Sequence, residues 1–434
     1  MKRMLIRNGR VVDPASNVDG NFDLVIMGGR IASIKPSGEK LETPETTDAG
    51  WDIIEASGKL VIPGLIDLHV HLREPGEEYK ETVESGTRAA AAGGVTTVFC
   101  MANTKPVNDS ESITKFIKDR AEASGFGAVY PVGAITKGLK GETSSEFFEL
   151  KASGCLAVSD DGRPVASASV MRRALEYAKG AGLVVITHAE EPTLSKGSMN
   201  EGAVSTRLGL RGIPNEAEDS MVGRDIGLAE LTGARLHVAH VSTKGAVELI
   251  RAAKKRGVQV TAEATPHHLA LTDDAVTLHG GYDTDAKMNP PLRSRADVDA
   301  LIEGIKDGTI DCIATDHAPH SALEKDVEFD VAANGVVGLE TSLGVVLTLV
   351  NSGHLTLVDV IRAMTANPAK AMGLGSGALR VGSQADVAVV DLDAEWTVEP
   401  EKFLSKGRNT PFKGWKLKGR VVTTVYNGKV VHKA

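Results

Sequence analysis

Between about residue 60 and residue 320 the chain alternates short apolar runs with longer helical patterns. The runs are rich in β-branched and aliphatic residues, which is typical of strands buried on both faces of a parallel sheet. The segments between them, such as 78–92 and 244–256, repeat apolar residues at three- and four-residue intervals and predict amphipathic helices. The apolar runs cover residues 60–71, 94–103, 128–136, 155–162, 183–190, 235–242, 258–266 and 311–320.

These runs, each followed by a helical pattern, predict a (β/α)8 TIM barrel. The two ends of the chain differ, because they show short strands interrupted by turn signals such as Asn8-Gly9 and Asn427-Gly428. A second unit is expected, since single cores rarely exceed about 300 residues. We therefore predict an α/β protein in which residues 61–374 form the barrel, and residues 1–60 and 375–434 together form a small β-sandwich domain.

Composition, net charge and cysteine spacing limit the kinds of partner and the cellular location that we expect. With 42% hydrophobic and 24% charged residues, the chain has the make-up of a soluble globular protein. Its net charge of -8 disfavours nucleic acid as a partner. Three widely spaced cysteines fit a reducing cytoplasm, and no apolar run suggests a signal peptide or a membrane span. We expect a cytoplasmic protein that acts on a small molecule.

Polar residues close several of the apolar runs, where a barrel carries its reactive groups. In the segment 67–73, alternate residues share one strand face, so His69, His71 and Arg73 are expected to point into the barrel mouth. Two such histidines can bind one metal ion; the alternative is that one packs and the other caps a loop. Further candidates stand at the ends of other strands: Asp161, His188, His240 and Asp316.

Four imidazoles and two carboxylates exceed the ligand set of one tetrahedral zinc ion. The sequence therefore predicts two metal ions with separate ligand sets. One would be bound by His69, His71 and Asp316. The other would be bound by His188 and His240, with a carboxylate bridging the two ions.

Two segments, 64–76 and 314–320 followed by Lys325, closely resemble the two signatures of dihydroorotase, a family of the amidohydrolase superfamily. The resemblance spans nearly the whole chain, and its length and Ser159-Asp160-Asp161-Gly162 motif resemble the type I branch. It implies reversible hydrolysis of (S)-dihydroorotate to N-carbamoyl-L-aspartate, the third step of pyrimidine and UMP biosynthesis. The attacking group would be a metal-bound hydroxide.

The resemblance also implies roles for individual residues. In many relatives a carboxylated lysine bridges the metals, but the run 155–162 contains no lysine and Lys151 lies on the preceding helix. We therefore expect Asp161 and a hydroxide to bridge two Zn²⁺ ions, and Asp316 to shuttle the proton. Arg73 can hold the substrate carboxylate in a bidentate fork. By resemblance Asn103 and His320 complete that carboxylate site, and Asn289 contacts the substrate ring.

Two other readings stay open. One is a hydantoinase, allantoinase or dihydropyrimidinase on the same barrel, which Arg73, Asn103 and His320 argue against. The other is a non-catalytic companion of aspartate transcarbamoylase, disfavoured because all six candidate ligands are present. We expect a homodimer that can also associate with the transcarbamoylase. Segment 321–335 is a candidate mobile lid, whereas His267 and His268 are expected to have loop roles and His237 to pack against a helix.

Overall fold

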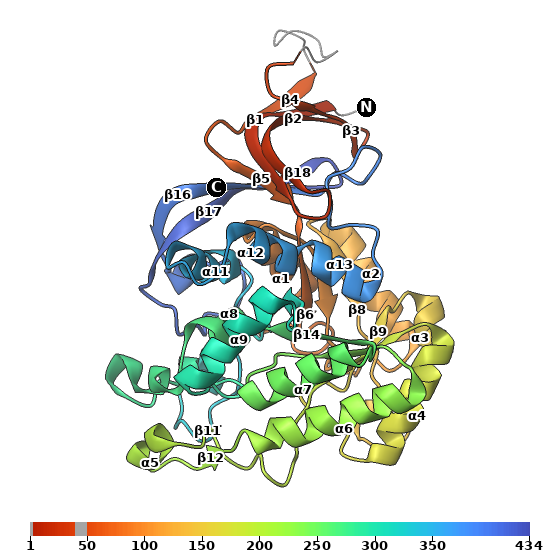
Figure 1. The fold of residues 1–434 in the computed structure, drawn as a ribbon, viewed down its shortest axis with the longest axis vertical. Helices are drawn as coiled ribbons and strands as arrows, with labels where there is room; N and C mark the ends of the chain where they lie inside the picture. Colours follow the sequence, from red (N-terminus) through yellow and green to blue (C-terminus); the bar gives the residue numbers. More distant parts are fainter. Residues whose placement is uncertain (1–2, 40–49) are drawn as a thin grey trace.

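The protein is represented by a computed structural model that describes residues 3–39 and 50–434, so residues 1–2 and 40–49 of the predicted range 1–60 lie outside the described residues. Both ends of the chain contribute to one eight-stranded sheet above the rest of the molecule (Figure 1). Its strands are β1 (Arg3–Asp13), β2 (Val18–Met27), β3 (Arg30–Pro36), β4 (Trp51–Glu55), β5 (Leu60–Pro63), β16 (Val387–Thr397), β17 (Lys416–Tyr426) and β18 (Lys429–Lys433).

Strand β5 joins the two ends within this sheet. It pairs in parallel with β1 and antiparallel with β16, and Val61 is opposite both Val11 and Val389. Asn427-Gly428 forms the predicted turn, between β17 and β18. Asn8-Gly9 does not: β1 continues through it with a bulge. A Cβ at Gly9 would lie 2.4 Å from Val61 Cγ2, so this glycine permits close packing instead of reversing the chain.

The second part of the molecule is a parallel barrel, which confirms the predicted fold class. Each barrel strand lies within one of the apolar runs. Isolated parallel bridges complete the ring, from Gly133 to Val158 and from Val70 to His317. The strands are β6 (Leu65–Val70), β7 (Val95–Cys100), β8 (Ala128–Pro131), β9 (Ala157–Val158), β10 (Val184–Thr187), β13 (Leu236–Val238), β14 (Val260–Ala264) and β15 (Cys312–Ile313).

The first apolar run, 60–71, is not one strand as predicted. It is divided at Gly64 into β5, in the sheet of the chain ends, and β6, in the barrel. A side chain at Gly64 would collide with Thr96, whose Oγ1 lies 2.2 Å from the Cβ position. The chain therefore passes from one sheet to the other at Gly64, where the lack of a side chain permits this close approach. The predicted domain bounds stay a prediction.

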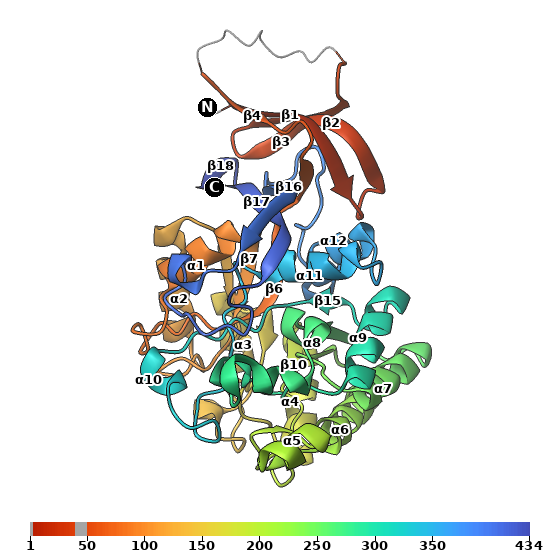
Figure 2. The same cartoon turned by 90° about the vertical axis from the view of Figure 1, so that its left-hand side faces the viewer.

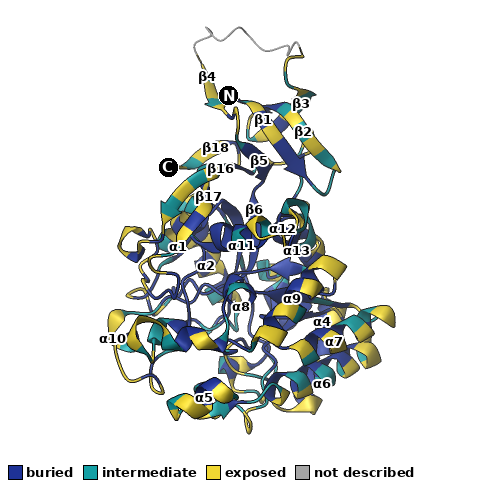
Figure 3. Cartoon of the chain, turned by 60° about the vertical axis from the view of Figure 1, so that its left-hand side comes forward, coloured by how far each residue is buried: buried dark blue, intermediate teal, exposed yellow. Residues whose placement is uncertain are grey.

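Helices surround the barrel (Figure 2), with buried faces toward the strands and exposed faces outward (Figure 3). In α7, for example, Val247 and Ile250 are buried and Thr243 caps the first turn. The larger helices are α1 (Val83–Ala92), α2 (Glu111–Ser124), α3 (Phe147–Ser153), α4 (Ala168–Ala181), α6 (Glu216–Thr232), α7 (Lys244–Lys255), α9 (Arg295–Asp307), α11 (Ser342–Asn351), α12 (Leu357–Met364) and α13 (Ala366–Met372).

Short elements fill the loops at the barrel mouth: β11 (Met199–Asn200), β12 (Gly212–Ile213), α5 (Ala203–Leu208), α8 (Pro266–Ala270) and α10 (Ala322–Lys325). Four 3-10 helices complete the set: η1 (Lys137–Leu139), η2 (Asp273–Gly280), η3 (Thr284–Ala286) and η4 (Pro400–Lys402). Within residues 3–39 and 50–434, no helix combines the length and the apolar character needed to cross a bilayer. The three cysteines are buried free thiols.

Candidate metal centre and active site

The six predicted metal-binding side chains lie together at the carboxyl ends of the barrel strands. His69 belongs to β6, while the others stand in the segments that directly follow β6, β9, β10, β13 and β15. The side chains are buried: His69, His71, Asp161, His188, His240 and Asp316. Because the carboxyl ends of parallel strands open at one mouth of a barrel, residues far apart in sequence meet there.

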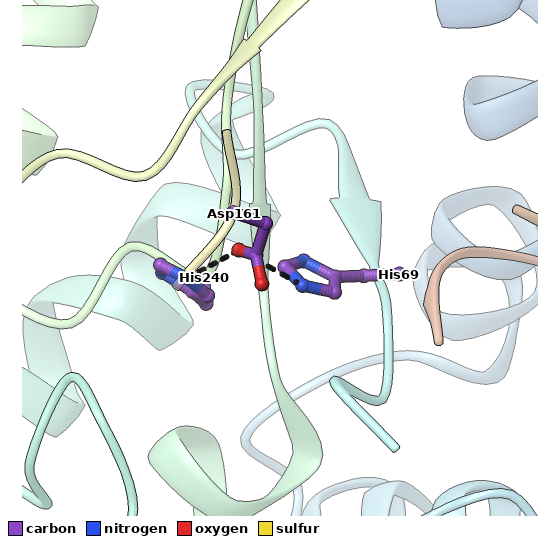
Figure 4. Close-up of side chains that lie close together, drawn as sticks. All are labelled: His69, Asp161 and His240. Atoms are coloured by element: carbon purple, nitrogen blue, oxygen red, sulfur yellow. Dashed lines mark ion pairs between the residues drawn. The ribbon is translucent and has the colours of Figure 1, made fainter. Parts of the chain in front are cut away.

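Asp161 lies between His69 and His240 (Figure 4). Its Oδ1 lies 3.3 Å from His69 Nε2 and 3.5 Å from both His188 Nδ1 and His240 Nε2. Its other oxygen, Oδ2, lies 3.5 Å from His71 Nε2. The two carboxylate oxygens therefore face different imidazoles, which is the arrangement that a bridging carboxylate requires.

Asp316 also contacts two histidines of this cluster. Its Oδ1 lies 3.0 Å from His71 Nε2 and 3.5 Å from His69 Nε2. Two groups of potential ligand atoms lie within 4.8 Å of one another, one formed by His69, His71 and Asp316 and the other by His69, Asp161 and His240. His69 thus belongs to both groups, whereas the sequence analysis assigned it to one metal.

Three of the four histidines have an oxygen partner on their outer side. His69 Nδ1 lies 2.7 Å from Glu263 Oε1, His71 Nδ1 lies 2.9 Å from Asn103 Oδ1, and His188 Nε2 lies 3.3 Å from Glu190 Oε2. These oxygens accept hydrogen bonds, so the outer imidazole nitrogens are the donors. The inner nitrogens can then offer a lone pair to a cation, as metal-binding histidines do.

The electrostatics of the cluster favour positive charge at its centre. Burial lowers the pKa of His69, but the carboxylates of Asp161 and Asp316 outweigh this and raise it well above its usual value. Burial also opposes the charged form of His188, yet hydrogen bonds to Asp161 and Glu190 raise its pKa to about 10. Burial raises the pKa values of Asp161 and Asp316. The neighbouring imidazoles outweigh this effect and hold both pKa values below their usual range.

These residues fit divalent cations. His69 Nε2 and Asp161 Oδ1 are buried and have no hydrogen-bond partner among the described residues. An unsatisfied buried polar atom costs about 1–3 kcal/mol, and a cation between these two atoms would remove that cost. Imidazole nitrogens and carboxylate oxygens are also ligands that Zn²⁺ accepts.

Three site residues have a left-handed backbone: Arg73 (φ 61°), His240 (φ 32°) and Asp316 (φ 48°). Such conformations are uncommon outside glycine and cost about 1–3 kcal/mol each. Strand β6 ends at Val70, so His71 and Arg73 are loop residues. The strand alternation that we used to orient Arg73 therefore does not apply to this residue. The loop conformation, and not the strand, directs its side chain into the site.

Arg73 is a buried cation that forms no ion pair with any described residue. Its Nε donates to Pro319 O at 3.3 Å, and its Nη2 lies 3.4 Å from His320 Nε2. Of the other predicted substrate residues, Asn103 contacts His71, and Asn289 Nδ2 donates to Glu190 Oε1 at 3.1 Å. The four residues predicted to contact substrate thus adjoin the cluster or Arg73.

The sequence analysis missed Glu263. Glu263 Oε1 contacts His69, and Glu263 Oε2 lies 3.0 Å from His237 Nε2. His237 Nδ1 in turn lies 2.8 Å from Thr261 Oγ1. His237, which we expected to pack against a helix, therefore bonds to polar groups. An acidic residue within the buried run 258–266 was the signal that could have identified Glu263.

His268, for which we predicted a loop role, contacts the loop that contains Asn289. It lies in α8, and its Nε2 donates to Pro290 O at 3.0 Å, next to Asn289. Its neighbour His267 is buried, and burial lowers the pKa of His267 to about 4. His268 thereby fixes the backbone from which Asn289 extends toward the cluster.

Comparisons with known proteins identify the family of this chain. Residues 60–431 match the amidohydrolase family model. The chain is 59% identical over 430 residues to a dihydroorotase from Anaeromyxobacter sp. (strain K), covering 99% of this chain and 98% of that one. It is 56% identical over 431 residues to a dihydroorotase from Geobacter metallireducens, covering 99% of both.

Among solved structures, the L-hydantoinase (dihydropyrimidinase) of Arthrobacter aurescens matches with a TM-score of 0.87 and 28% identity, covering 100% of this chain and 96% of that one. The dihydropyrimidinase of Brevibacillus agri NCHU1002 matches with a TM-score of 0.85 and 25% identity, covering 99% and 95%. Both matches extend over the barrel and the sheet of the chain ends.

Proposed function

The chain belongs to the amidohydrolase family, and from this premise we propose that it is a dihydroorotase, which reversibly hydrolyses (S)-dihydroorotate to N-carbamoyl-L-aspartate. The observation that carries the proposal is the 59% identity over 430 residues to a protein of that name. The hydantoinase that shares the fold is 28% identical. The family match and the names of the relatives both support a cyclic amidohydrolase that acts on a small molecule.

We propose that the cluster binds two Zn²⁺ ions, with Asp161 as the bridging carboxylate. Its two oxygens face different histidines, which supports this role. Lys151 is remote from the cluster, since its Nζ donates to Gly182 O at 3.4 Å. When bound, two such ions lower the pKa of a water molecule and polarise the amide carbonyl of the substrate.

The proton that the attacking water loses must reach the leaving amide nitrogen. We propose that Asp316 carries it. Its contacts with His69 and His71 are made through Oδ1, so Oδ2 can accept the proton and return it. Because closing the dianionic product to the monoanionic ring consumes one proton, acidic conditions favour ring closure and alkaline conditions favour hydrolysis.

Arg73 supplies the specificity for an anionic ring. A buried guanidinium without a carboxylate partner is costly, and a substrate carboxylate would satisfy it with a charge-assisted pair. We propose that Asn103 and His320 complete this carboxylate site and that Asn289 binds the ring. Neutral hydantoins lack the carboxylate and gain nothing from Arg73.

Turnover assays with dihydroorotate, hydantoin and allantoin test the proposal. We expect turnover of dihydroorotate alone. If the protein turns over hydantoin or allantoin but not dihydroorotate, the proposal is wrong. The activity is then that of the hydantoinase group, which a solved structure of similar fold favours. An inactive, metal-loaded chain that copurifies with aspartate transcarbamoylase would indicate a scaffold instead. The homodimer and the cytoplasmic location remain predictions, which sedimentation and cell fractionation can check.

A further inference from the structure

The ammonium group of Lys325, at the end of α10, is buried among backbone carbonyls. Its Nζ donates to Lys287 O at 3.3 Å, Ala333 O at 2.9 Å and Gly335 O at 3.2 Å. The residue is 5% exposed and forms no ion pair with any described residue. An ammonium group has three N–H donors, so three carbonyls from two separate segments satisfy it completely.

Both of these segments lead to residues assigned to the substrate. The first continues from Lys287 to Asn289. In the second, Asn334 O accepts a hydrogen bond from His320 Nε2 at 2.8 Å. The two segments also bond directly, since Gly335 N donates to Lys287 O at 3.0 Å. Lys325 therefore lies at the junction of two backbone segments that hold substrate-binding side chains.

The fit at Gly335 leaves little freedom for movement. Gly335 has a φ of 147°, and a Cβ there would lie 2.7 Å from Ala318 Cβ and 3.1 Å from His320 Cδ2. The backbone of this segment thus packs directly against the His320 ring. A displacement of segment 333–335 would necessarily move the surroundings of His320.

Asn409 forms hydrogen bonds with the same segment. It is buried in the loop between η4 and β17, and its Nδ2 donates to Gly335 O at 2.9 Å and Ala318 O at 3.0 Å. Its Oδ1 accepts from His320 N at 3.0 Å. The carbonyl of Gly335 therefore receives one hydrogen bond from Lys325 and another from Asn409.

We propose that Lys325 is a positioning residue for the substrate-carboxylate side of the site: its ammonium group fixes segments 287–289 and 333–335 relative to each other, and Asn409 fixes the second against His320. The inference rests on the proposed function, which assigns Asn289 and His320 to the substrate. Lys325 acts through the backbone, and its Nζ bonds to no candidate metal ligand. Its loss should therefore weaken substrate binding and leave metal binding intact.

The variant Lys325→Met keeps the length of the side chain and removes its three donors. We expect the KM for dihydroorotate to rise about tenfold or more, because displacements near 1 Å can cost up to 10²-fold. We expect kcat to fall less and the metal content to stay that of the wild type. Amide hydrogen exchange in segment 333–337 should accelerate, and this measurement does not depend on catalysis.

Two further variants and a control accompany this test. Lys325→Arg restores donors and should recover part of the lost affinity, and Asn409→Leu should raise KM in the same way as Lys325→Met. Lys254→Met is the control: Lys254 lies on α7, and its Nζ donates to Gly308 O at 2.9 Å and to Asp311, outside both segments. We expect this variant to change KM less than Lys325→Met does.

Three results would overturn the inference. The first is a KM within twofold of wild type with unchanged hydrogen exchange in Lys325→Met. The second is a loss of metal from that variant, and the third is an equal KM change in Lys254→Met. If Lys325→Met does not fold, Asn409→Leu with unchanged KM and unchanged exchange counts against it equally. A wild-type enzyme that does not turn over dihydroorotate refutes the proposed function, while hydrogen exchange still tests the positioning of segment 333–337.

Discussion

His69 and Glu263 are joined by a hydrogen bond of 2.7 Å between Nδ1 and Oε1, although one lies on β6 and the other on β14. The same carboxylate contacts His237 through Oε2. Burial raises the pKa of Glu263, but its hydrogen bonds to His237 and His69 lower it to about 2, so it is ionised at neutral pH. Glu263 therefore orients His69 so that Nε2 faces Asp161.

Replacing Glu263 with Gln should weaken metal binding. The neutral amide keeps the size of the side chain but loses the charge that favours the donor state of His69 Nδ1. Loss of such a partner typically reduces metal affinity 10–100-fold. Competition with a chelator, followed by elemental analysis, measures the change. Glu248→Gln, on the exposed face of α7, is the control, and equal metal retention in both variants would contradict the prediction.

Asp316→Asn should abolish turnover and leave the fold intact. Asn tolerates the left-handed backbone at this position (φ 48°), so the substitution adds little strain. The amide cannot accept and return the proton, and general acid–base groups typically contribute 10²–10⁴-fold to the rate. Steady-state kcat and circular dichroism check the two halves of the prediction. A kcat within tenfold of wild type would remove Asp316 from the proton pathway.

Activity should not depend on bicarbonate if Asp161 is the bridge that we propose, because an aspartate needs no carboxylation. Apo-enzyme is reconstituted with Zn²⁺ in degassed buffer, with and without bicarbonate, and its initial rates are compared. Equal rates are expected. Restoration of activity by bicarbonate would require a carboxylated lysine and a different role for Asp161.

Arg73→Met should weaken substrate binding far more than metal binding. Hydrogen bonds to charged groups contribute about 1.5–3 kcal/mol, so KM for dihydroorotate should rise roughly 10–150-fold at unchanged zinc content. Arg172→Met, which removes an exposed ion pair with Glu176 on α4, controls for loss of a guanidinium. If zinc is lost while KM is kept, Arg73 supports the metal centre instead.

Glu340 should make the protein less stable as pH rises. Burial raises the pKa of Glu340 to about 7, while hydrogen bonds from the Leu404 and Ser405 backbone oppose this. Its folded-state pKa exceeds the value of 4.5 that it has without the fold, so its destabilising effect is absent below pH 4.5 and complete above about pH 7.

Glu340→Gln removes this titration. The Tm of the variant relative to wild type should therefore be higher at pH 8 than at pH 5. Thermal denaturation at the two pH values provides the measurement, with the exposed Glu395→Gln as the control. A Tm difference between variant and wild type that does not change with pH would contradict the prediction.

The barrel and the family could be predicted from the sequence, and both predictions are confirmed. Strands buried on both faces are mostly apolar, so each barrel strand is recognisable in the sequence as an apolar run. The ligand candidates were identifiable because they are polar residues near the ends of those runs. The change of sheets at Gly64 was not readable, because it depends on contact with Thr96 and on pairing with β16.

Other contacts could not be predicted for a similar reason. Lys325 and Asn409 act through backbone carbonyls, and any residue provides a carbonyl, so the sequence carries no signal for their partners. The orientation of Arg73 depends on a left-handed loop conformation, which strand alternation does not encode. Glu263 was the exception, since a carboxylate in an apolar run is visible in the sequence.

The position of β5 between β1 and β16 has a consequence for synthesis in the cell. More than 300 residues separate β5 from β16. At about 5–20 residues per second, the ribosome needs on the order of tens of seconds to deliver the missing neighbour. During translation the unpaired edge of β5 remains open to other nascent chains, so a chaperone that shields it should raise the yield of folded enzyme.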